Sequence, residues 1–136
     1  MKPRVLVVDD DVEFTQLIEF NLAQEGCESF AAHTGVHALR MAKAQLPDVI
    51  LLDVMLPDLN GLAVCEILNS QAKTSDIPIL ILSSLNQSWT KSTKSKARFV
   101  RFFTKPVNLK LLCQTIQAAA WDHLVKSRSH LAEKGL

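Results

Sequence analysis

Short apolar runs alternate along the chain with segments in which apolar residues recur every three or four positions. The runs predict strands, and the recurrences predict helices. Five strands are predicted in this way, over residues 4–8, 28–32, 48–53, 77–84 and 99–103. The first, third and fourth of these are continuous apolar runs, which is typical of strands buried on both faces.

Between and after the strands, apolar residues recur at helical spacing in four segments. They are Phe14, Leu17, Ile18 and Leu22; Ala38, Leu39, Ala42 and Leu46; Val64, Cys65 and Leu68; and Leu109, Leu112, Ile116 and Ala119. We assign a fifth helix to residues 86–96, a polar segment rich in serine, threonine and lysine. Asp10 and Glu13 resemble a capping box that starts the first helix, and Asp11 is interpreted as a helix-start residue.

The alternation of strands and helices predicts the fold class. Strands joined through helices form right-handed crossovers and a mostly parallel sheet. We therefore expect an α/β protein with a doubly wound, five-stranded parallel sheet and five helices. The length of 136 residues suits one domain. We assign residues 1–126 to it and residues 127–136 to a C-terminal tail or linker remnant, because no core pattern continues there.

Composition indicates whether the chain folds and in which compartment it is found. A chain with 48% hydrophobic and 21% charged residues is expected to fold. Its cysteines are three in number, widely spaced and without a CxxC pair, which favours buried thiols in a reducing compartment over disulfides or a zinc site. We see no leader and no apolar run of about 18 residues, so we expect a cytoplasmic protein without a membrane partner.

Polar residues stand where four of the strands end. Asp9 and Asp10 follow the first strand, Asp53 ends the third, Ser83 the fourth, and Lys105 follows the fifth. The carboxyl ends of parallel strands share one edge of the sheet, where ligands gather. Two carboxylates about 4 Å apart repel by roughly 4 kcal/mol at an effective dielectric of 20. A hard divalent cation, most plausibly Mg²⁺, would relieve the crowding of the three aspartates.

A carboxylate beside Mg²⁺ can also attack phosphorus and form an aspartyl phosphate. Asp53 is the predicted nucleophile, because it stands alone at the end of the central apolar strand. Lys105 would pair with one phosphoryl oxygen as a point charge, and Ser83 would donate a hydrogen bond to another.

Four motifs in order resemble the receiver domain of bacterial two-component response regulators, over about residues 3 to 122. They are "LVVDDD", "ILLDVMLPDLNG", "ILILSS" and "FFTKP". The resemblance implies a flavodoxin-like fold with strand order 2-1-3-4-5. It also implies transfer of a phosphoryl group to Asp53 from a phosphohistidine of a sensor histidine kinase or phosphotransfer protein. Mg²⁺ would be held by Asp10, Asp53 and the backbone carbonyl of Met55, with Asp9 acting through water.

The resemblance further implies a signalling switch rather than a turnover enzyme. Phosphorylation adds charge at Asp53, Ser83 moves to meet it, and Phe102, at the aromatic switch position, fills the vacated space. The surface of the fourth helix, fifth strand and last helix would be remodelled for a partner. The Lys105–Pro106 bond would be cis, as an X–Pro bond can be.

Departures from the family pattern bear on partners. No acidic residue lies between Ile77 and Trp121, a stretch that carries seven lysines and arginines. In the winged-helix DNA-binding subfamily, acids before the fifth strand and early in the last helix form intersubunit salt bridges, and both are missing here. We expect an acidic partner surface instead, or like-charge repulsion against self-pairing through this face, and no direct binding of nucleic acid by this domain. Met55 and Leu85 are apolar where polar side chains position the attacking water, which predicts slow dephosphorylation.

Several alternatives stay open at this point. An aspartate-nucleophile phosphatase of the haloacid dehalogenase type would use Asp9 and Asp11, and a degenerate receiver would act only as a binding scaffold. A nucleotide binder is disfavoured, because no Gly-rich phosphate loop follows the first strand. Asp58 is interpreted as a turn residue, and His33 and His37 as surface residues. The tryptophans at 89 and 121 are interpreted either as interface anchors or as partly buried residues.

Overall fold

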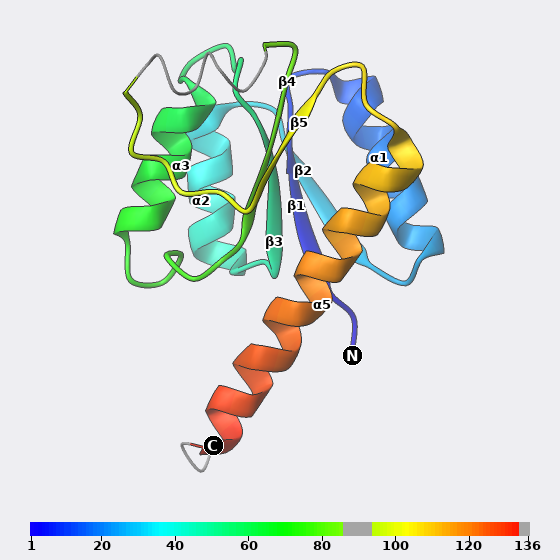
Figure 1. The fold of residues 1–136 in the computed structure, drawn as a ribbon, viewed down its shortest axis with the longest axis vertical. Coiled ribbons are helices and arrows are strands. Elements are labelled where there is room, and N and C mark those ends of the chain that lie inside the picture. Colours follow the sequence, from blue (N-terminus) through cyan, green and yellow to red (C-terminus); the bar gives the residue numbers. More distant parts are fainter. Residues whose placement is uncertain (86–93, 134–136) are drawn as a thin grey trace.

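The computed structural model describes residues 1–85 and 94–133, with side chains as far as Ser129. Its centre is a five-stranded parallel sheet in the order β2-β1-β3-β4-β5, as expected (Figure 1). The strands are β1 (Arg4–Val8), β2 (Glu28–Ala32), β3 (Val49–Asp53), β4 (Ile79–Ser83) and β5 (Arg101–Thr104). All residues of β3 and β4 are buried, which confirms that these apolar runs are central strands.

Two helical layers cover the sheet. The described helices are α1 (Val12–Gln24), α2 (Gly35–Gln45), α3 (Gly61–Ser70) and α5 (Leu109–Glu133). The first and last lie on one face of the sheet, and α2 and α3 lie on the other (Figure 1). The fifth predicted helix falls mainly on residues 86–93, outside the described residues, and residues 94–96 are not helical.

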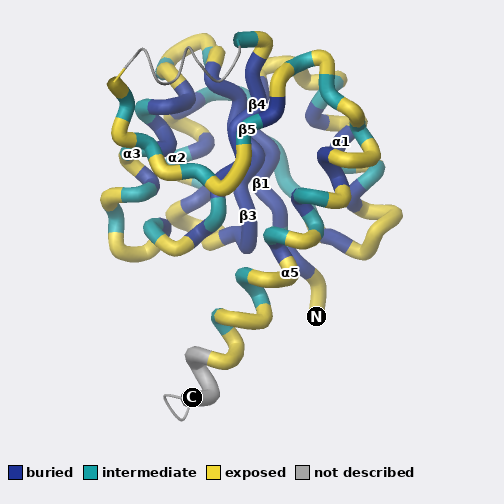
Figure 2. The backbone as a smooth tube through the Cα atoms, in the orientation of Figure 1, coloured by how far each residue is buried: buried dark blue, intermediate teal, exposed yellow. Residues whose placement is uncertain are grey.

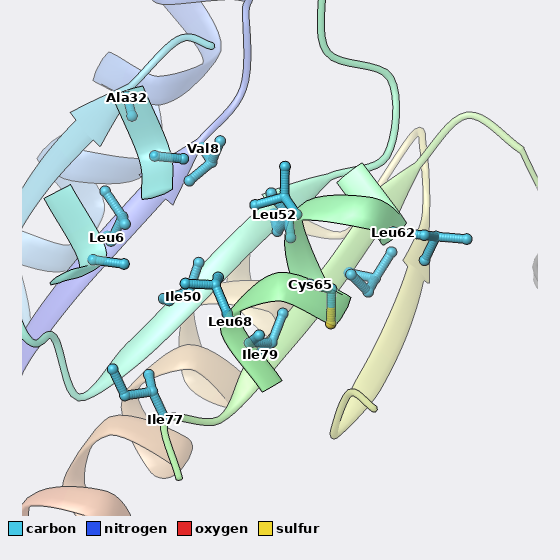
Figure 3. Packing of buried hydrophobic residues seen from close by; sticks show 14 of the residues in the cluster. Leu6, Val8, Ala32, Ile50, Leu52, Leu62, Cys65, Leu68, Ile77 and Ile79 are labelled. Atoms are coloured by element: carbon cyan, nitrogen blue, oxygen red, sulfur yellow. The ribbon is translucent and has the colours of Figure 1, made fainter. Parts of the chain in front are cut away.

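The alternation of side chains along each strand supplies both layers with a core. Figure 3 shows one of them, in which Ile50 and Ile79 of the strands lie near Cys65 and Leu68 of α3. Each such side chain, once buried, contributes roughly 1.5–3 kcal/mol. The predicted burial of the thiols is confirmed for all three cysteines. Burial raises the pKa of Cys65 to about 12, so this thiol stays protonated at neutral pH.

Some predicted boundaries need correction. The N-cap of α1 is Asp11, whose carboxylate accepts a hydrogen bond from the backbone N–H of Phe14, so Asp10 does not form the capping box. Leu46 is not a core residue of α2, since it forms the C-cap in a left-handed conformation and is 46% exposed. The fifth strand starts at Arg101, two residues later than predicted.

The last helix is longer than its apolar spacing predicted. It runs to Glu133, so the division proposed at residue 126 lies inside it. Its C-terminal half projects away from the sheet, and no described side chain after Ala120 is buried (Figures 1 and 2). Near the point of departure, His123 Nδ1 donates to Asp48 Oδ1 over 3.0 Å. The other oxygen of Asp48 accepts from the backbone N–H of Arg4 at 2.9 Å, so one carboxylate joins the helix to the amino ends of two strands.

Candidate functional site

The carboxyl edge of the sheet brings the predicted site residues together. One carboxylate oxygen of each of Asp9, Asp10 and Asp53 lies within 4.8 Å of the other two. Lys105 enters from the loop after β5, and its Nζ donates to Asp9 Oδ2 at 2.8 Å and to Asp53 Oδ2 at 3.1 Å. Three acids and one ammonium, from three distant parts of the sequence, therefore form one cluster.

Lys105 is bound from several directions. Partial burial alone would lower the pKa of its ammonium, but the hydrogen bonds and negative charges of Asp9 and Asp53 outweigh this effect and raise the pKa. The ammonium also lies 5.1 Å from the ring centroid of Phe14, within cation–π range. Its backbone N–H donates to the carbonyl of Ser83, which fixes the loop to the end of β4. The Lys105–Pro106 bond is cis, as predicted.

Backbone amides orient the two buried carboxylates. Asp9 Oδ1 accepts from the N–H of Asp11, and Asp53 Oδ1 accepts from the N–H of Met55, both at 3.0 Å. Asp9 and Asp53 are only 2% and 4% exposed, whereas Asp10 is exposed. Of the three carboxylates, that of Asp10 is therefore the one open to solvent.

The other predicted residues lie around this cluster. Ser83 ends β4, next to β3, and its buried hydroxyl accepts from the N–H of Leu85 at 3.0 Å. Among the described residues, its hydroxyl makes no hydrogen bond to Asp53 or Lys105. Phe102 lies half-buried in β5, with its ring centroid 6.2 Å from that of Phe99. The side chain of Met55 is 56% exposed at the rim.

The donor set fits a hard divalent cation. Three carboxylates converge on one point, and the ammonium of Lys105 already neutralises part of their charge. Mg²⁺ prefers oxygen ligands and needs only one or two carboxylates besides its waters. By contrast, the carboxylate of Asp11 is engaged at the start of α1 and lies outside the cluster, which disfavours the phosphatase alternative.

The sequence and the fold of this chain both resemble those of known proteins. Residues 5–117 match the response regulator receiver domain, which is most of the chain. The chain belongs to this family. Receiver domains of known structure share its fold: the chemotaxis response regulator CheY4 of Vibrio cholerae superposes with a TM-score of 0.79 at 28% identity, covering 88% of this chain and 99% of that one. The receiver domain of the Francisella response regulator 1452 gives 0.77 at 29% identity, covering 89% and 98%.

Curated relatives of this receiver domain are longer proteins. The DNA-binding dual master transcriptional regulator RpaA of Synechocystis sp. is 33% identical over 116 residues, which cover 85% of this chain and 48% of that protein. The response regulator PleD of Caulobacter vibrioides is 35% identical over 125 residues, covering 92% and 28%. The chain thus spans half or less of the length of these relatives. No described helix is long and apolar enough to cross a membrane.

Gly61, the first residue of α3, was not singled out for the site, although it packs on the backbone of the predicted nucleophile. A Cβ on Gly61 would lie 2.1 Å from the backbone oxygen of Asp53 and 2.7 Å from Cα of Val54. The N–H of Gly61 also donates to the carbonyl of Val54 at 2.7 Å. The first turn of α3 therefore packs directly on the backbone that carries the receiver domain's central aspartate.

Replacing Gly61 by alanine is expected to destabilise the domain by about 1–3 kcal/mol, because backbone rather than a flexible side chain must move. Urea unfolding would measure the loss. Ala63→Gly, in the same turn of α3, measures the effect of helix propensity alone and should cost about 1 kcal/mol. A Gly61→Ala protein as stable as the wild type would contradict the close packing.

Asp58 has a wider role than the predicted turn. Its carboxylate accepts from the N–H groups of Gly35 and Val36, at 2.7 and 3.0 Å, and so caps the first turn of α2 from the loop after β3. These backbone hydrogen bonds lower the pKa of Asp58. Because the folded pKa is depressed, the stabilisation is present above the ordinary carboxyl pKa of about 3.9 and is lost as pH falls through the folded value.

Asp58→Asn is therefore expected to lower the unfolding temperature at pH 7 and to lose this effect under acid. Calorimetry on both proteins between pH 7 and about pH 3 would show the two curves converging as the wild-type carboxylate is protonated. Asp76→Asn is the matched control, at an exposed aspartate with no side-chain hydrogen bond in the described part of the chain. A gap that stays constant across this range would mean that the charge of Asp58 is not involved.

His33 and His37, both predicted to be surface residues, differ in exposure. His37 is exposed, as expected for a surface residue. His33 is half-buried, and its Nδ1 donates to the backbone carbonyl of Asp9 at 2.9 Å. The end of β2 is thus joined to the acidic end of β1, which the sequence interpretation of His33 did not foresee.

Proposed function

We propose that this chain is a phosphorylation-controlled switch in which Asp53 accepts a phosphoryl group from a phosphohistidine. The donor would be a sensor histidine kinase or a phosphotransfer protein. One observation carries the proposal: the ammonium of Lys105 bonds the buried carboxylates of Asp9 and Asp53 beside the exposed carboxylate of Asp10. A buried nucleophile, a fixed cation and an open acidic entrance are the parts that phosphoryl transfer needs.

The metal in this proposal is Mg²⁺. Asp10 and Asp53 would hold it together with the backbone carbonyl of Met55, and Asp9 would act through water, as the family resemblance implies. A bound Mg²⁺ would neutralise charge on the phosphoryl oxygens. The exposure of Asp10 supports this assignment, because a hydrated ion has to enter from solvent.

In the transfer step, a carboxylate oxygen of Asp53 forms a bond to phosphorus as the bond between phosphorus and the donor's imidazole nitrogen breaks. The electron pair of the broken bond stays on that nitrogen. The N–H of Met55 and the ammonium of Lys105 hold the carboxylate of Asp53 in place. After transfer, Lys105 pairs with a phosphoryl oxygen, and the hydroxyl of Ser83 donates to another.

The response to phosphorylation would begin at Ser83 and Phe102. The added charge at Asp53 attracts the Ser83 hydroxyl, which at present accepts from the N–H of Leu85. Its movement would open space toward β5, into which the half-buried ring of Phe102 can turn. In this way the surface around β5 and α5 would change for a partner.

The partner surface is proposed to be acidic. The described part of the stretch from Ile77 to Trp121 carries six cations and no acid, namely Lys94, Lys96, Arg98, Arg101, Lys105 and Lys110. Arg101 lies exposed on the edge strand β5, and its guanidinium sits 5.0 Å from the ring centroid of Phe103. A partner with clustered carboxylates would be attracted to this edge, whereas a like-charged one would be repelled.

The test is chemical phosphorylation. The full chain is incubated with acetyl phosphate, with and without Mg²⁺, and the modified residue is mapped by mass spectrometry after reduction of the acyl phosphate with borohydride. We expect modification at Asp53 that requires Mg²⁺. Modification at another residue, or none under conditions that label a known receiver domain, would overturn the proposal.

The phosphorylated protein is expected to lose its phosphoryl group slowly, because Met55 and Leu85 provide no polar group to position an attacking water. Met55→Asn, which places an amide at the rim, should shorten the lifetime by about tenfold, less than the roughly 10²–10⁴-fold of full general acid–base catalysis, because an amide orients the water without taking its proton. Decay of the purified phosphoprotein, followed after removal of acetyl phosphate, measures both lifetimes. Loss of phosphate from the wild type within seconds would contradict the prediction.

A further inference from the structure

Phe14 differs in burial from the inward-facing residues that follow it on α1. Ile18 and Leu22 are fully buried, whereas Phe14 is only half-buried. It packs at the edge of the core that α1 and α5 form with one face of the sheet. Part of its ring is therefore left for a neighbour outside that core.

That neighbour is the ammonium of Lys105. Its Nζ lies 5.1 Å from the centroid of the Phe14 ring, within the roughly 6 Å over which a ring face attracts a cation. The same nitrogen donates to one oxygen of Asp9 and one of Asp53, at 2.8 and 3.1 Å. The ammonium is thus held by two carboxylates at the ends of strands and by an aromatic ring on a helix.

The start of α1 determines where the ring lies. The backbone N–H of Phe14 donates to the carboxylate of Asp11, the N-cap, at 3.1 Å. The N–H of Asp11 donates in turn to Asp9 Oδ1 at 3.0 Å. One capping residue therefore connects the aspartate that binds the ammonium to the residue that carries the ring.

Lys105 is the member of the site that benefits most from such a contact. Its side chain is a flexible four-carbon stem and is 29% exposed, so water competes for the ammonium. The carboxylates of Asp9 and Asp53 are nearly inaccessible and are held by backbone N–H groups. A group that is already held beside the reacting atoms contributes more to a reaction than one that first has to be brought there.

We propose that Phe14 is a positioning residue for phosphoryl transfer to Asp53, because its ring keeps the ammonium of Lys105 in the site while the other partners of that ammonium change. This inference rests on the proposed function. As an oxygen of Asp53 bonds to phosphorus, the donor leaves with the electron pair of its own bond to phosphorus. The Asp53 carboxylate thereby loses its negative charge and attracts Lys105 less. The ring face attracts the ammonium equally before and after transfer, so Lys105 stays beside the phosphoryl oxygen with which it pairs.

The rate of phosphorylation of the full chain by acetyl phosphate and Mg²⁺ tests this role. Phe14→Leu keeps an apolar side chain but removes the ring, and the rate constant should fall about fivefold, equivalent to about 1 kcal/mol. Phe14→Tyr restores a ring and should return the rate to within about twofold of the wild type. Ile18→Val is the matched control, because it removes packing from the same core one turn further along α1. Its rate should also stay within about twofold of the wild type.

A fluorinated ring separates the attraction of the cation from the filling of space. Phenylalanine fluorinated on the ring, incorporated in place of Phe14, has nearly the same shape but less negative charge on its face. We expect its rate to fall at least about twofold. Labelling of this protein and of Phe14→Leu at the wild-type rate would overturn the positioning role and leave the proposed function intact. Absence of labelling at Asp53 in the wild type would overturn both.

The contact can also be measured without phosphorylation. In urea unfolding without divalent cations, Phe14→Leu should raise the unfolding equilibrium constant by a factor about fivefold larger in the wild type than in Lys105→Gln, where no cation is left to lose. Glutamine is chosen because the thioether of a methionine would itself be attracted to the ring. Equal effects of Phe14→Leu in the two backgrounds would show that ring and ammonium are not coupled, and would overturn the proposal.

Discussion

Asparagine in place of Asp53 is expected to reduce phosphorylation of the chain by at least about a thousandfold, because the amide has no anionic oxygen to attack phosphorus. The substitution leaves the shape of the side chain unchanged. The amide oxygen can still accept from the N–H of Met55 or from Lys105, so the site should keep its architecture. Incorporation of phosphate from acetyl phosphate in the presence of Mg²⁺ measures the effect.

The matched control is Asp11→Asn, at the residue that directly follows the acidic pair of Asp9 and Asp10. Asp11 caps α1 and lies outside the carboxylate cluster, and asparagine is as good an N-cap as aspartate. Its phosphorylation rate should stay within about twofold of the wild type. If the Asp53→Asn protein were labelled as fast as the Asp11→Asn protein, the acceptor would have to be another residue.

Lys105→Met is expected to lower the free energy of unfolding by about 2 kcal/mol in the absence of divalent cations. Two carboxylates that are nearly inaccessible to solvent, those of Asp9 and Asp53, would lose their shared counter-charge. Removal of one partner from a fully buried pair costs about 3–5 kcal/mol, and the partial exposure of Lys105 reduces this figure.

Magnesium separates this electrostatic cause from a simple loss of packing. If the carboxylates are destabilised by their charge, then Mg²⁺ should stabilise the Lys105→Met protein more than it stabilises the wild type. Urea unfolding with and without Mg²⁺ measures the difference. Lys110→Met, at an exposed lysine without an ion pair in the described chain, should change stability by less than about 0.5 kcal/mol. Equal effects of the metal on both proteins would refute the explanation.

Strands and the acidic edge could be predicted because their causes are local. The continuous apolar runs that became β1, β3 and β4 are typical of strands that are buried on both faces in a parallel sheet. Once the sheet is parallel, Asp9, Asp53 and Lys105 must meet at its carboxyl edge, wherever they lie in the sequence. Asp10 was assigned wrongly to a capping box, whereas Asp11, which was interpreted as a helix-start residue, is the N-cap of α1.

Features that depend on tertiary contacts could not be predicted. Asp58 caps a helix that starts 23 residues earlier, and nothing near either position signals the pairing. The close approach of Gly61 to the backbone of Asp53 is likewise a matter of how a loop returns to the sheet. The length of α5 was underestimated because its second half lacks the inward-facing apolar residues by which helices are recognised.

Because His123 is hydrogen-bonded to Asp48, β3 connects the base of the long helix α5 to the acidic cluster at the carboxyl edge of the sheet. Asp48 directly precedes the strand, and Asp53 ends it, so the proposed phosphoacceptor and the attachment of the long helix are separated by one rigid strand. The helix α5 leaves the body of the domain near His123. Glu133 lies roughly 15 Å further along the axis, at 1.5 Å per residue. A small change in the tilt of α5 at His123 therefore produces a larger displacement of the C-terminal end of the helix.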